Sequence, residues 1–168
     1  MINKTDIITE SIYLYPSALV VKSEPVYIHT ILGSCISVCL FDTVMKIGGI
    51  NHYMLPYWNG SELASPKYGN IAIERLIAGM NSLGSKTGHL IAKVFGGGAV
   101  LEVNHSSFNI GEKNIRVAVD LLAANKIPIV AQSTGGTNGR KIIFNTYSGE
   151  VVHRFIKNES NKKFGQAL

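Results

Sequence analysis

The sequence predicts an α/β fold of the α+β kind: a layered sandwich of mostly antiparallel or mixed β-sheet with two main helices packed on it. Short β-branched segments bounded by turn residues outnumber the segments with helical spacing. The helical segments do not alternate regularly with strands, as they would in repeated βαβ units. The chain has 168 residues, of which 46% are hydrophobic and 16% charged, so it is long enough to bury a core. We expect one domain over residues 1–156 and a polar tail over residues 157–168.

The strand candidates are rich in valine, isoleucine and aromatic residues, and turn residues separate them. Ser148-Gly149 between the last two predicts a hairpin, since this pair suits a tight turn. The candidates are Ser11–Tyr15, Leu19–Val21, Val26–Ile31, Ile36–Phe41, Ile47–Tyr53, Leu90–Phe95, Ile127–Gln132, Lys141–Tyr147 and Val151–Phe155.

Apolar residues at helical spacing predict a helix over residues 71–80, ended by Gly84. Its buried face is expected to hold Ala72, Ile73, Leu76, Ile77 and Met80. A second helix is predicted to start after Gly111 and to end at Asn125 or Lys126, shortly before Pro128. Its expected buried residues are Ile115, Ala118, Val119 and Leu122.

Charge and composition exclude several classes of protein. The chain carries 16 Lys and Arg against 11 Asp and Glu, a net charge of +5. These basic residues form no stripe and no aromatic residues alternate with them, so nucleic-acid binding is not expected. No apolar run approaches the roughly 18 residues of a membrane span, and the N-terminus lacks the order of a signal peptide. Two cysteines also suit a cytoplasmic protein without membrane insertion.

The two cysteines differ in their surroundings. Cys35 and Cys39 would lie ~13 Å apart in a strand, whereas a disulfide needs Cα atoms ~4.4–6.8 Å apart. No further ligands stand at zinc-site spacing, so no metal is expected. Cys39 lies inside an apolar strand and suits a small buried residue. Cys35 follows Gly33-Ser34 between two strands, which suits either a structural cysteine or a nucleophile beside backbone amides that could stabilise an oxyanion.

A cysteine nucleophile needs a base, and His52 is the candidate that the topology favours. If Ile36–Phe41 and Ile47–Tyr53 pair as a hairpin, Cys35 and His52 stand at the two free ends and become neighbours. His29 is a rival on the same strand face as Cys35. A straight strand would nevertheless keep those two side chains ~20 Å apart, too far for proton transfer.

A third group usually orients the imidazole of such a pair. Thr30 is the first candidate, and Asn51 and Ser34 are alternatives. Two glycine runs, around Gly97 and Gly136, lack the P-loop and dinucleotide-binding patterns, so no cofactor is expected. They suit either tight turns or close approach of the backbone to a substrate chain. The expected substrate-binding residues are therefore Ser34, Asn51, Gly97 and Gly136.

Several segments together resemble the CheD family of chemoreceptor glutamine deamidases, from about Leu14 to Val152. The two most specific are Leu32-Gly33-Ser34-Cys35 and Asn51-His52-Tyr53-Met54-Leu55-Pro56 at this spacing. Similar segments that follow in order are Lys67-Tyr68-Gly69, the Ala72–Leu76 helix, Ala92-Lys93-Val94-Phe95-Gly96-Gly97-Gly98-Ala99, Asn109-Ile110-Gly111-Glu112-Lys113-Asn114, Thr134-Gly135-Gly136 and Gly139-Arg140.

The resemblance implies a sandwich fold related to bacterial toxin deamidases and a Cys–His–Thr triad that falls on Cys35, His52 and Thr30. It implies conversion of glutamines in methyl-accepting chemotaxis receptors to glutamate, and a possible second partner, a CheC-type phosphatase. Gln132-Ser133 departs from the pattern, because similar proteins often carry an acidic residue there.

Two other functions remain open at this stage. One is a non-catalytic module that binds a receptor or a CheC-type phosphatase. The other is a cysteine peptidase, which would also cleave backbone peptide bonds.

Overall fold

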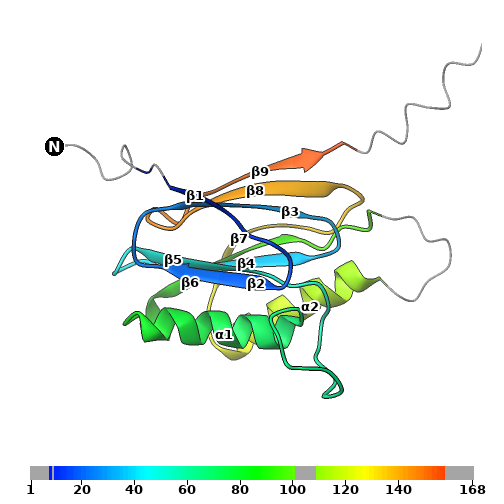
Figure 1. Cartoon of the computed structure of the whole chain (residues 1–168), viewed down its shortest axis with the longest axis horizontal. Helices are drawn as coiled ribbons and strands as arrows, with labels where there is room; N and C mark the ends of the chain where they lie inside the picture. Colours follow the sequence, from blue (N-terminus) through cyan, green and yellow to red (C-terminus); the bar gives the residue numbers. More distant parts are fainter. Residues whose placement is uncertain (1–7, 9, 101–108, 158–168) are drawn as a thin grey trace, which may run out of the picture.

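Two stacked β-sheets and a layer of helices form the structure (Figure 1). This computed structural model describes residues 8, 10–100 and 109–157. The helices cover the outer face of one sheet, and in Figure 1 no helix covers the outer face of the other. The predicted fold class is confirmed. The tail predicted at residues 157–168 lies, apart from Lys157, outside the described residues.

One sheet has four strands in the order β1-β3-β8-β9. β1 runs parallel to β3, and the other pairs are antiparallel. β8 and β9 form the hairpin that Ser148-Gly149 predicted. The strand bounds are β1 (Ser11–Tyr13), β3 (Tyr27–Leu32), β8 (Gly139–Asn145) and β9 (Val151–Ile156).

The other sheet has five strands in the order β2-β5-β4-β6-β7. Only the pair β6–β7 is parallel. Every residue of β4 and β5 is buried, because the helices cover one face and the second sheet covers the other. The strand bounds are β2 (Ala18–Lys22), β4 (Ile36–Asp42), β5 (Ile47–His52), β6 (Leu90–Gly96) and β7 (Ile129–Thr134).

The β7 strand begins two residues later than the predicted Ile127–Gln132. The reason is the C-terminal end of the preceding helix, where Lys126 has a positive φ of 56°. The N–H of Ile127 bonds the carbonyl of Leu122 at 2.9 Å, an arrangement that closes a helix end. Ile127 therefore belongs to the helix cap and is buried in the core.

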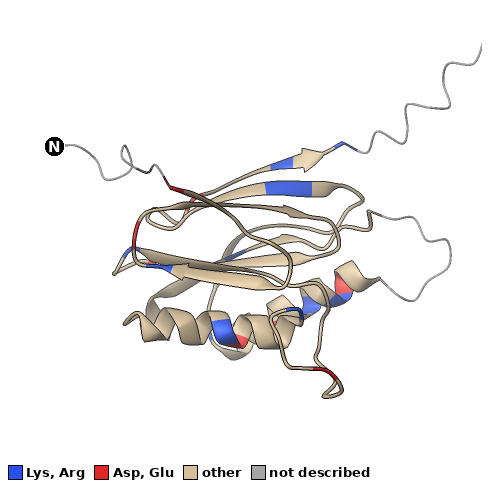
Figure 2. Cartoon of the chain, in the orientation of Figure 1, with Lys and Arg blue, Asp and Glu red and all other residues tan. Residues whose placement is uncertain are grey.

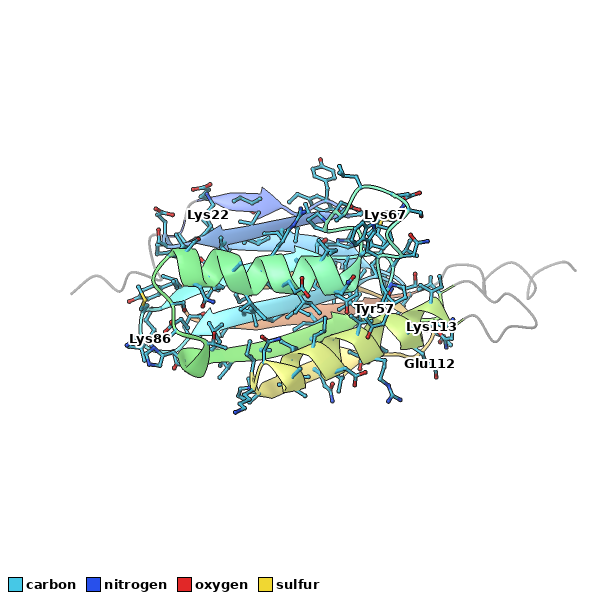
Figure 3. All side chains as sticks on the ribbon, turned by 90° about the horizontal axis from the view of Figure 1, so that it is seen from below. Lys22, Tyr57, Lys67, Lys86, Glu112 and Lys113 are labelled. Atoms are coloured by element: carbon cyan, nitrogen blue, oxygen red, sulfur yellow. The ribbon has the colours of Figure 1, made fainter. Side chains whose placement is uncertain are left out.

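The helices α1 (Gly69–Ser82) and α2 (Ile110–Ala124) lie side by side across the five-stranded sheet (Figure 3), and a short 3₁₀ helix, η2 (Thr87–His89), precedes β6. The predicted buried face of α1 is confirmed, and Gly84 follows its end with a positive φ of 97°. Within the described part of the chain, no helix is long and apolar enough to cross a membrane.

The buried face of α2 differs from the predicted one. Val119 is 39% exposed, so its predicted burial was wrong. Asn114 and Val117 are buried instead, together with Gly111, Ala118 and Leu122. The apolar pattern alone predicts that a polar asparagine lies on the exposed face of α2. In the structure, Asn114 lies on the buried face, toward the sheet.

Two apolar clusters divide the core between the two faces of β4. Ile36, Val38 and Leu40 pack with the helices, whereas Cys39 belongs to the cluster between the sheets. Cys35 packs against this second cluster, as the alternation of side chains along the strand requires. The sequence therefore directs Cys35 into the space between the two sheets.

The β4–β5 turn is closed by the carboxylate of Asp42. Its Oδ1 accepts hydrogen bonds from the N–H groups of Val44 and Met45, both at 2.8 Å, and Ser85 Oγ donates to Oδ2. Burial raises the pKa of Asp42, but these hydrogen bonds outweigh it and the net pKa lies below its ordinary value. The closed turn sets the register in which β4 and β5 pair.

We expect Gly49→Ala to lower the free energy of unfolding by about 1–3 kcal/mol, because it overpacks the contact of β5 with β2 and α1. A Cβ atom at residue 49 would lie 2.5 Å from Val21 Cγ1 and 3.0 Å from Leu76 Cδ1. Urea denaturation measures the change. Gly88→Ala is the control, since a Cβ there meets nothing within 4 Å. Equal stability of the two variants would contradict this account of the packing.

Candidate active site

The predicted β4–β5 hairpin is present, and its register places Cys35 and His52 on the same face at its open end. Beyond the last ladder pair, Ile36 and Tyr53 exchange two backbone hydrogen bonds of 3.1 and 3.0 Å. In this register Cys35 stands opposite Met54 and diagonal to His52, on the same face. Diagonal neighbours lie about 7–8 Å apart in their backbones, within reach of an imidazole.

Thr30 reaches His52 from the other sheet. Its Oγ1 lies 2.8 Å from His52 Nδ1 and also donates to the carbonyl oxygen of Leu14 at 2.8 Å. A hydroxyl has one proton, so Thr30 must accept from His52, and Nδ1 therefore carries the hydrogen. His52 Nε2 is left with its lone pair. Nε2 is buried and has no hydrogen-bond partner among the described residues.

Burial keeps both groups of the pair neutral. His52 is 2% exposed, and burial lowers its pKa to about 4, although the Leu14 carbonyl acts in the opposite direction. Burial also raises the pKa of the Cys35 thiol, while the residue's own backbone N–H opposes the rise. At neutral pH the site therefore holds a thiol and a neutral imidazole rather than a thiolate–imidazolium pair.

The backbone around Cys35 turns its carbonyl groups toward other segments. The Gly97 N–H bonds the Cys35 carbonyl and the Gly98 N–H bonds the Gly33 carbonyl, both at 2.9 Å. In the described part of the chain, neither the Ser34 N–H nor the Cys35 N–H donates to another residue. These two groups are thus available to bind a negatively charged oxygen near the thiol.

Asn114 is a residue of the site that the sequence analysis missed. Its side chain is fully buried, and Nδ2 donates to the carbonyl oxygens of Ser34 and Met54, each at 3.0 Å. The Tyr53 hydroxyl donates to the backbone carbonyl of Asn114. Asn114 belongs to one of the segments that resemble the family. The sequence alone does not show whether a polar residue on a helix faces the core or the solvent.

Of the expected substrate-binding residues, Ser34 lies beside Cys35 and is half-buried. The structure does not bring Asn51 to the same place. Its Oδ1 accepts a 2.9 Å hydrogen bond from the Val38 N–H, and the residue is fully buried. Because side chains alternate along β5, Asn51 faces the helices whereas His52 faces the other sheet.

Gly97 and Gly136 both have a positive φ, of 71° and 73°. A Cβ at Gly97 would lie 2.5 Å from Ile115 Cγ1, so packing against α2 requires glycine there. A Cβ at Gly136 would meet nothing within 4 Å. Gly136 lines an open pocket of about 560 Å³ together with Arg140 and Phe155. The Arg140 guanidinium donates to the Gly135 carbonyl at 2.7 Å and holds this loop in place.

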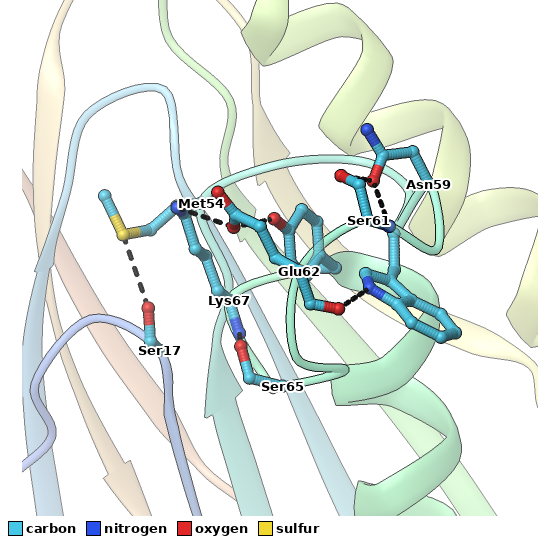
Figure 4. A network of polar contacts seen from close by, with 9 residues as sticks. Ser17, Met54, Asn59, Ser61, Glu62, Ser65 and Lys67 are labelled. Atoms are coloured by element: carbon cyan, nitrogen blue, oxygen red, sulfur yellow. Dashed lines mark hydrogen bonds and ion pairs between the residues drawn. The ribbon is translucent and has the colours of Figure 1, made fainter.

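The segment after β5 is held by a network of polar contacts (Figure 4). Ser17 Oγ donates to Met54 Sδ at 3.4 Å, and the N–H of Met54 bonds the Lys67 carbonyl at 2.9 Å. The Nζ atom of Lys67 lies 3.8 Å from the Oε2 atom of Glu62. Trp58 Nε1 donates a hydrogen bond to the backbone carbonyl of Glu62 at 2.7 Å. These contacts hold Met54, which is 37% exposed, opposite Cys35.

His29 does not take part in this arrangement. It alternates with Thr30 along β3, so it faces away from the space between the sheets and bonds Ser11. Among the described residues, no group of three His, Cys, Asp or Glu side chains is placed to hold a metal ion.

Comparison with known proteins shows that the chain is similar to one protein family over most of its length. The family model for CheD chemotactic sensory transduction matches residues 54–155. A probable chemoreceptor glutamine deamidase CheD of Sulfurimonas denitrificans is 46% identical over 149 residues, covering 88% of this chain and 96% of the relative. The proteins of the same description from Trichlorobacter lovleyi and Rhodospirillum rubrum are 48% and 43% identical, over 83% and 86% of this chain.

We expect the protein to lose stability as the pH falls from 6.5 toward 4, because the unfolded chain protonates His52 before the folded protein does. The loss attributable to this residue is about 3 kcal/mol, and it is absent at and above neutral pH. Urea denaturation of wild type and His52→Gln at a series of pH values isolates it. If the two stability curves stay parallel, His52 is not held neutral by the fold.

We expect iodoacetamide to alkylate Cys35 with a half-maximal rate at a pH above the ordinary thiol pKa, because burial raises the pKa of this thiol. Mass spectrometry of the labelled peptide measures the rate, and Cys39 is fully buried and should stay unlabelled. His52→Gln should leave the midpoint nearly unchanged, since a neutral imidazole does not stabilise a thiolate. A midpoint below pH 7 would show an ion pair instead.

Proposed function

The chain belongs to the CheD family, and we propose that it is a protein-glutamine deamidase that converts glutamines of chemoreceptors to glutamate, with Cys35 as nucleophile and His52 as base. The observation that carries the catalytic assignment is the hydrogen bond between Thr30 and His52. It leaves the unprotonated Nε2 on the side of the imidazole away from Thr30, as a general base requires.

The first half of the reaction forms a thioester. His52 Nε2 takes the Cys35 thiol proton as the sulfur attacks the carboxamide carbon of a glutamine side chain. The carbonyl oxygen becomes negatively charged, and the free N–H groups of Ser34 and Cys35 stabilise it. The imidazolium returns its proton to the nitrogen, the C–N bond breaks and ammonia leaves.

The second half hydrolyses the thioester. The neutral imidazole takes a proton from a water molecule, and the resulting hydroxide attacks the thioester carbon. The C–S bond breaks, the proton returns to the sulfur, and a glutamate side chain remains. His52 serves as base and acid in turn, and Thr30 keeps its ring in one orientation throughout.

A neutral pair suits this sequence of steps. Because the pKa of His52 lies well below 7 and that of Cys35 above its ordinary value, the proton stays on sulfur until a carbonyl carbon is in place. The thiol is therefore a weak nucleophile toward adventitious electrophiles at neutral pH. Transfer to Nε2 during attack supplies the thiolate only when a substrate is bound.

The partners follow from the family and from the surface. Chemoreceptors are the proposed substrate, and a CheC-type phosphatase is a second proposed partner, supported by the family resemblance alone. The described chain presents Lys and Arg on β8 and β9, among them Lys141 and Arg154 (Figure 2). Such a surface favours partners with acidic residues.

We expect Cys35→Ala to abolish deamidation of a cognate receptor, because no other described thiol lies at the site. Incubation with receptor followed by peptide mass spectrometry detects each glutamine that becomes glutamate. Cys39→Ala is the matched control, four residues along the same strand face, and should retain activity.

Conversion that persists unchanged in Cys35→Ala would overturn the proposal and favour the alternative of a binding module. Cleavage of the receptor backbone by wild type, lost in the variant, would favour a cysteine peptidase.

A further inference from the structure

We propose that Asn114 is a positioning residue that aims the backbone N–H of Cys35 at the developing oxyanion. This inference rests on the proposed function, since it concerns the same reaction. It starts from three observations on one side chain: complete burial, a location on α2 rather than on the catalytic strands, and two hydrogen bonds to segments that carry the catalytic pair.

The bond to Ser34 sets the direction of the neighbouring N–H group. In the planar trans peptide between Ser34 and Cys35, the carbonyl and the N–H point in opposite directions. Asn114 draws the Ser34 carbonyl toward α2 at 3.0 Å. The Cys35 N–H therefore points away from Asn114, and in the proposed reaction it donates to the oxyanion.

The second hydrogen bond joins the end of β5, the strand that carries His52, to the same amide group of Asn114. Asn114 Nδ2 also donates to the Met54 carbonyl, two residues after His52. The Tyr53 hydroxyl bonds the backbone carbonyl of Asn114. One side chain thus fixes the start of β4 and the end of β5 relative to each other, where no ladder pair beyond Ile36–Tyr53 does so.

The orientation of the asparagine amide is unambiguous. Two carbonyl oxygens face the terminal atom, and only the NH₂ group can donate to both. The Oδ1 atom has no partner among the described residues. The amide is therefore half-satisfied: its NH₂ group serves two carbonyl oxygens, while its buried Oδ1 lacks a hydrogen bond, which costs stability.

Of the carbonyl groups of residues 33 to 35, that of Ser34 is the one held by a side chain in the described part of the chain. The carbonyls of Gly33 and Cys35 are held by the backbone N–H groups of Gly98 and Gly97, which every residue type retains. The Ser34 carbonyl is held by the side chain of Asn114. In Figure 3 its neighbours Glu112 and Lys113 lie at the same end of α2, and both are exposed, whereas Asn114 is buried.

The test compares two reactions of the same thiol. Deamidation creates an oxyanion, whereas alkylation by iodoacetamide does not. We expect Asn114→Ala to lower kcat/KM for deamidation of a receptor peptide by about a hundredfold, the effect of losing an oxyanion donor. The alkylation rate of Cys35 should stay within a factor of about two of wild type, because the Ile36–Tyr53 pair and the Thr30–His52 hydrogen bond still hold the thiol and His52 in place.

Asn109→Ala is the matched control. Asn109 caps the same helix by accepting from the Glu112 N–H at 3.1 Å, so its loss loosens α2 without touching the Ser34 carbonyl. This variant should deamidate at nearly the wild-type rate. If Asn114→Ala does not fold, Asn114→Ser takes its place, because a serine hydroxyl is too short to reach both carbonyls.

The outcomes separate the two proposals. Wild type without Cys35-dependent deamidation refutes the proposed function. An active wild type with equal losses in Asn114→Ala and Asn109→Ala, or with alkylation slowed as much as deamidation, refutes the positioning role alone. Failure of both Asn114 variants to fold also refutes it, since the residue would then be required by the core.

Discussion

The hydrogen bond between Thr30 and His52 joins the two sheets inside the sandwich, and the proposed chemistry of the site depends on it. Thr30 belongs to β3 in the four-stranded sheet and His52 to β5 in the five-stranded sheet. Because the Thr30 hydroxyl already donates to the Leu14 carbonyl, it can only accept from the imidazole. Packing of the two sheets therefore decides which ring nitrogen can act as a base, and any change in their spacing would release that constraint.

Burial in this space explains the charge state of the pair. Desolvation acts in the same sense on both groups, favouring the neutral imidazole and the neutral thiol. No charged group contributes to the pKa shift of either the Cys35 thiol or the His52 imidazole. The resting site therefore holds a neutral thiol and a neutral imidazole rather than an ion pair. In the proposed reaction, the negative charge on the substrate oxygen is stabilised by backbone N–H groups.

The helix layer covers the five-stranded sheet and also contacts the segments around Cys35 and His52. At its N-terminal turn, α2 contacts the glycine loop through Gly111, where a Cβ would lie 2.4 Å from the Gly97 carbonyl oxygen. One turn further, Asn114 bonds the segments on both sides of the pair. Gly97 and Gly111 thus allow α2 to pack closely on the loop after β6, and Asn114 joins the same helix to the segment that precedes Cys35.

The sequence by itself determined the α1 face, the β4–β5 hairpin and most strands, because these depend on local periodicity and turn residues. The hairpin register in turn places Cys35 and His52 on one face. Tertiary structure alone decided the rest. Strand alternation could not relate Thr30 to Cys35, since the chain leaves one sheet after Leu32 and enters the other at Ile36. Alternation does exclude Asn51 once His52 is known to face the other sheet. The sequence pattern could not predict the burial of Asn114. A polar side chain is buried where carbonyl groups from distant segments accept its hydrogen bonds, here those of Ser34 and Met54.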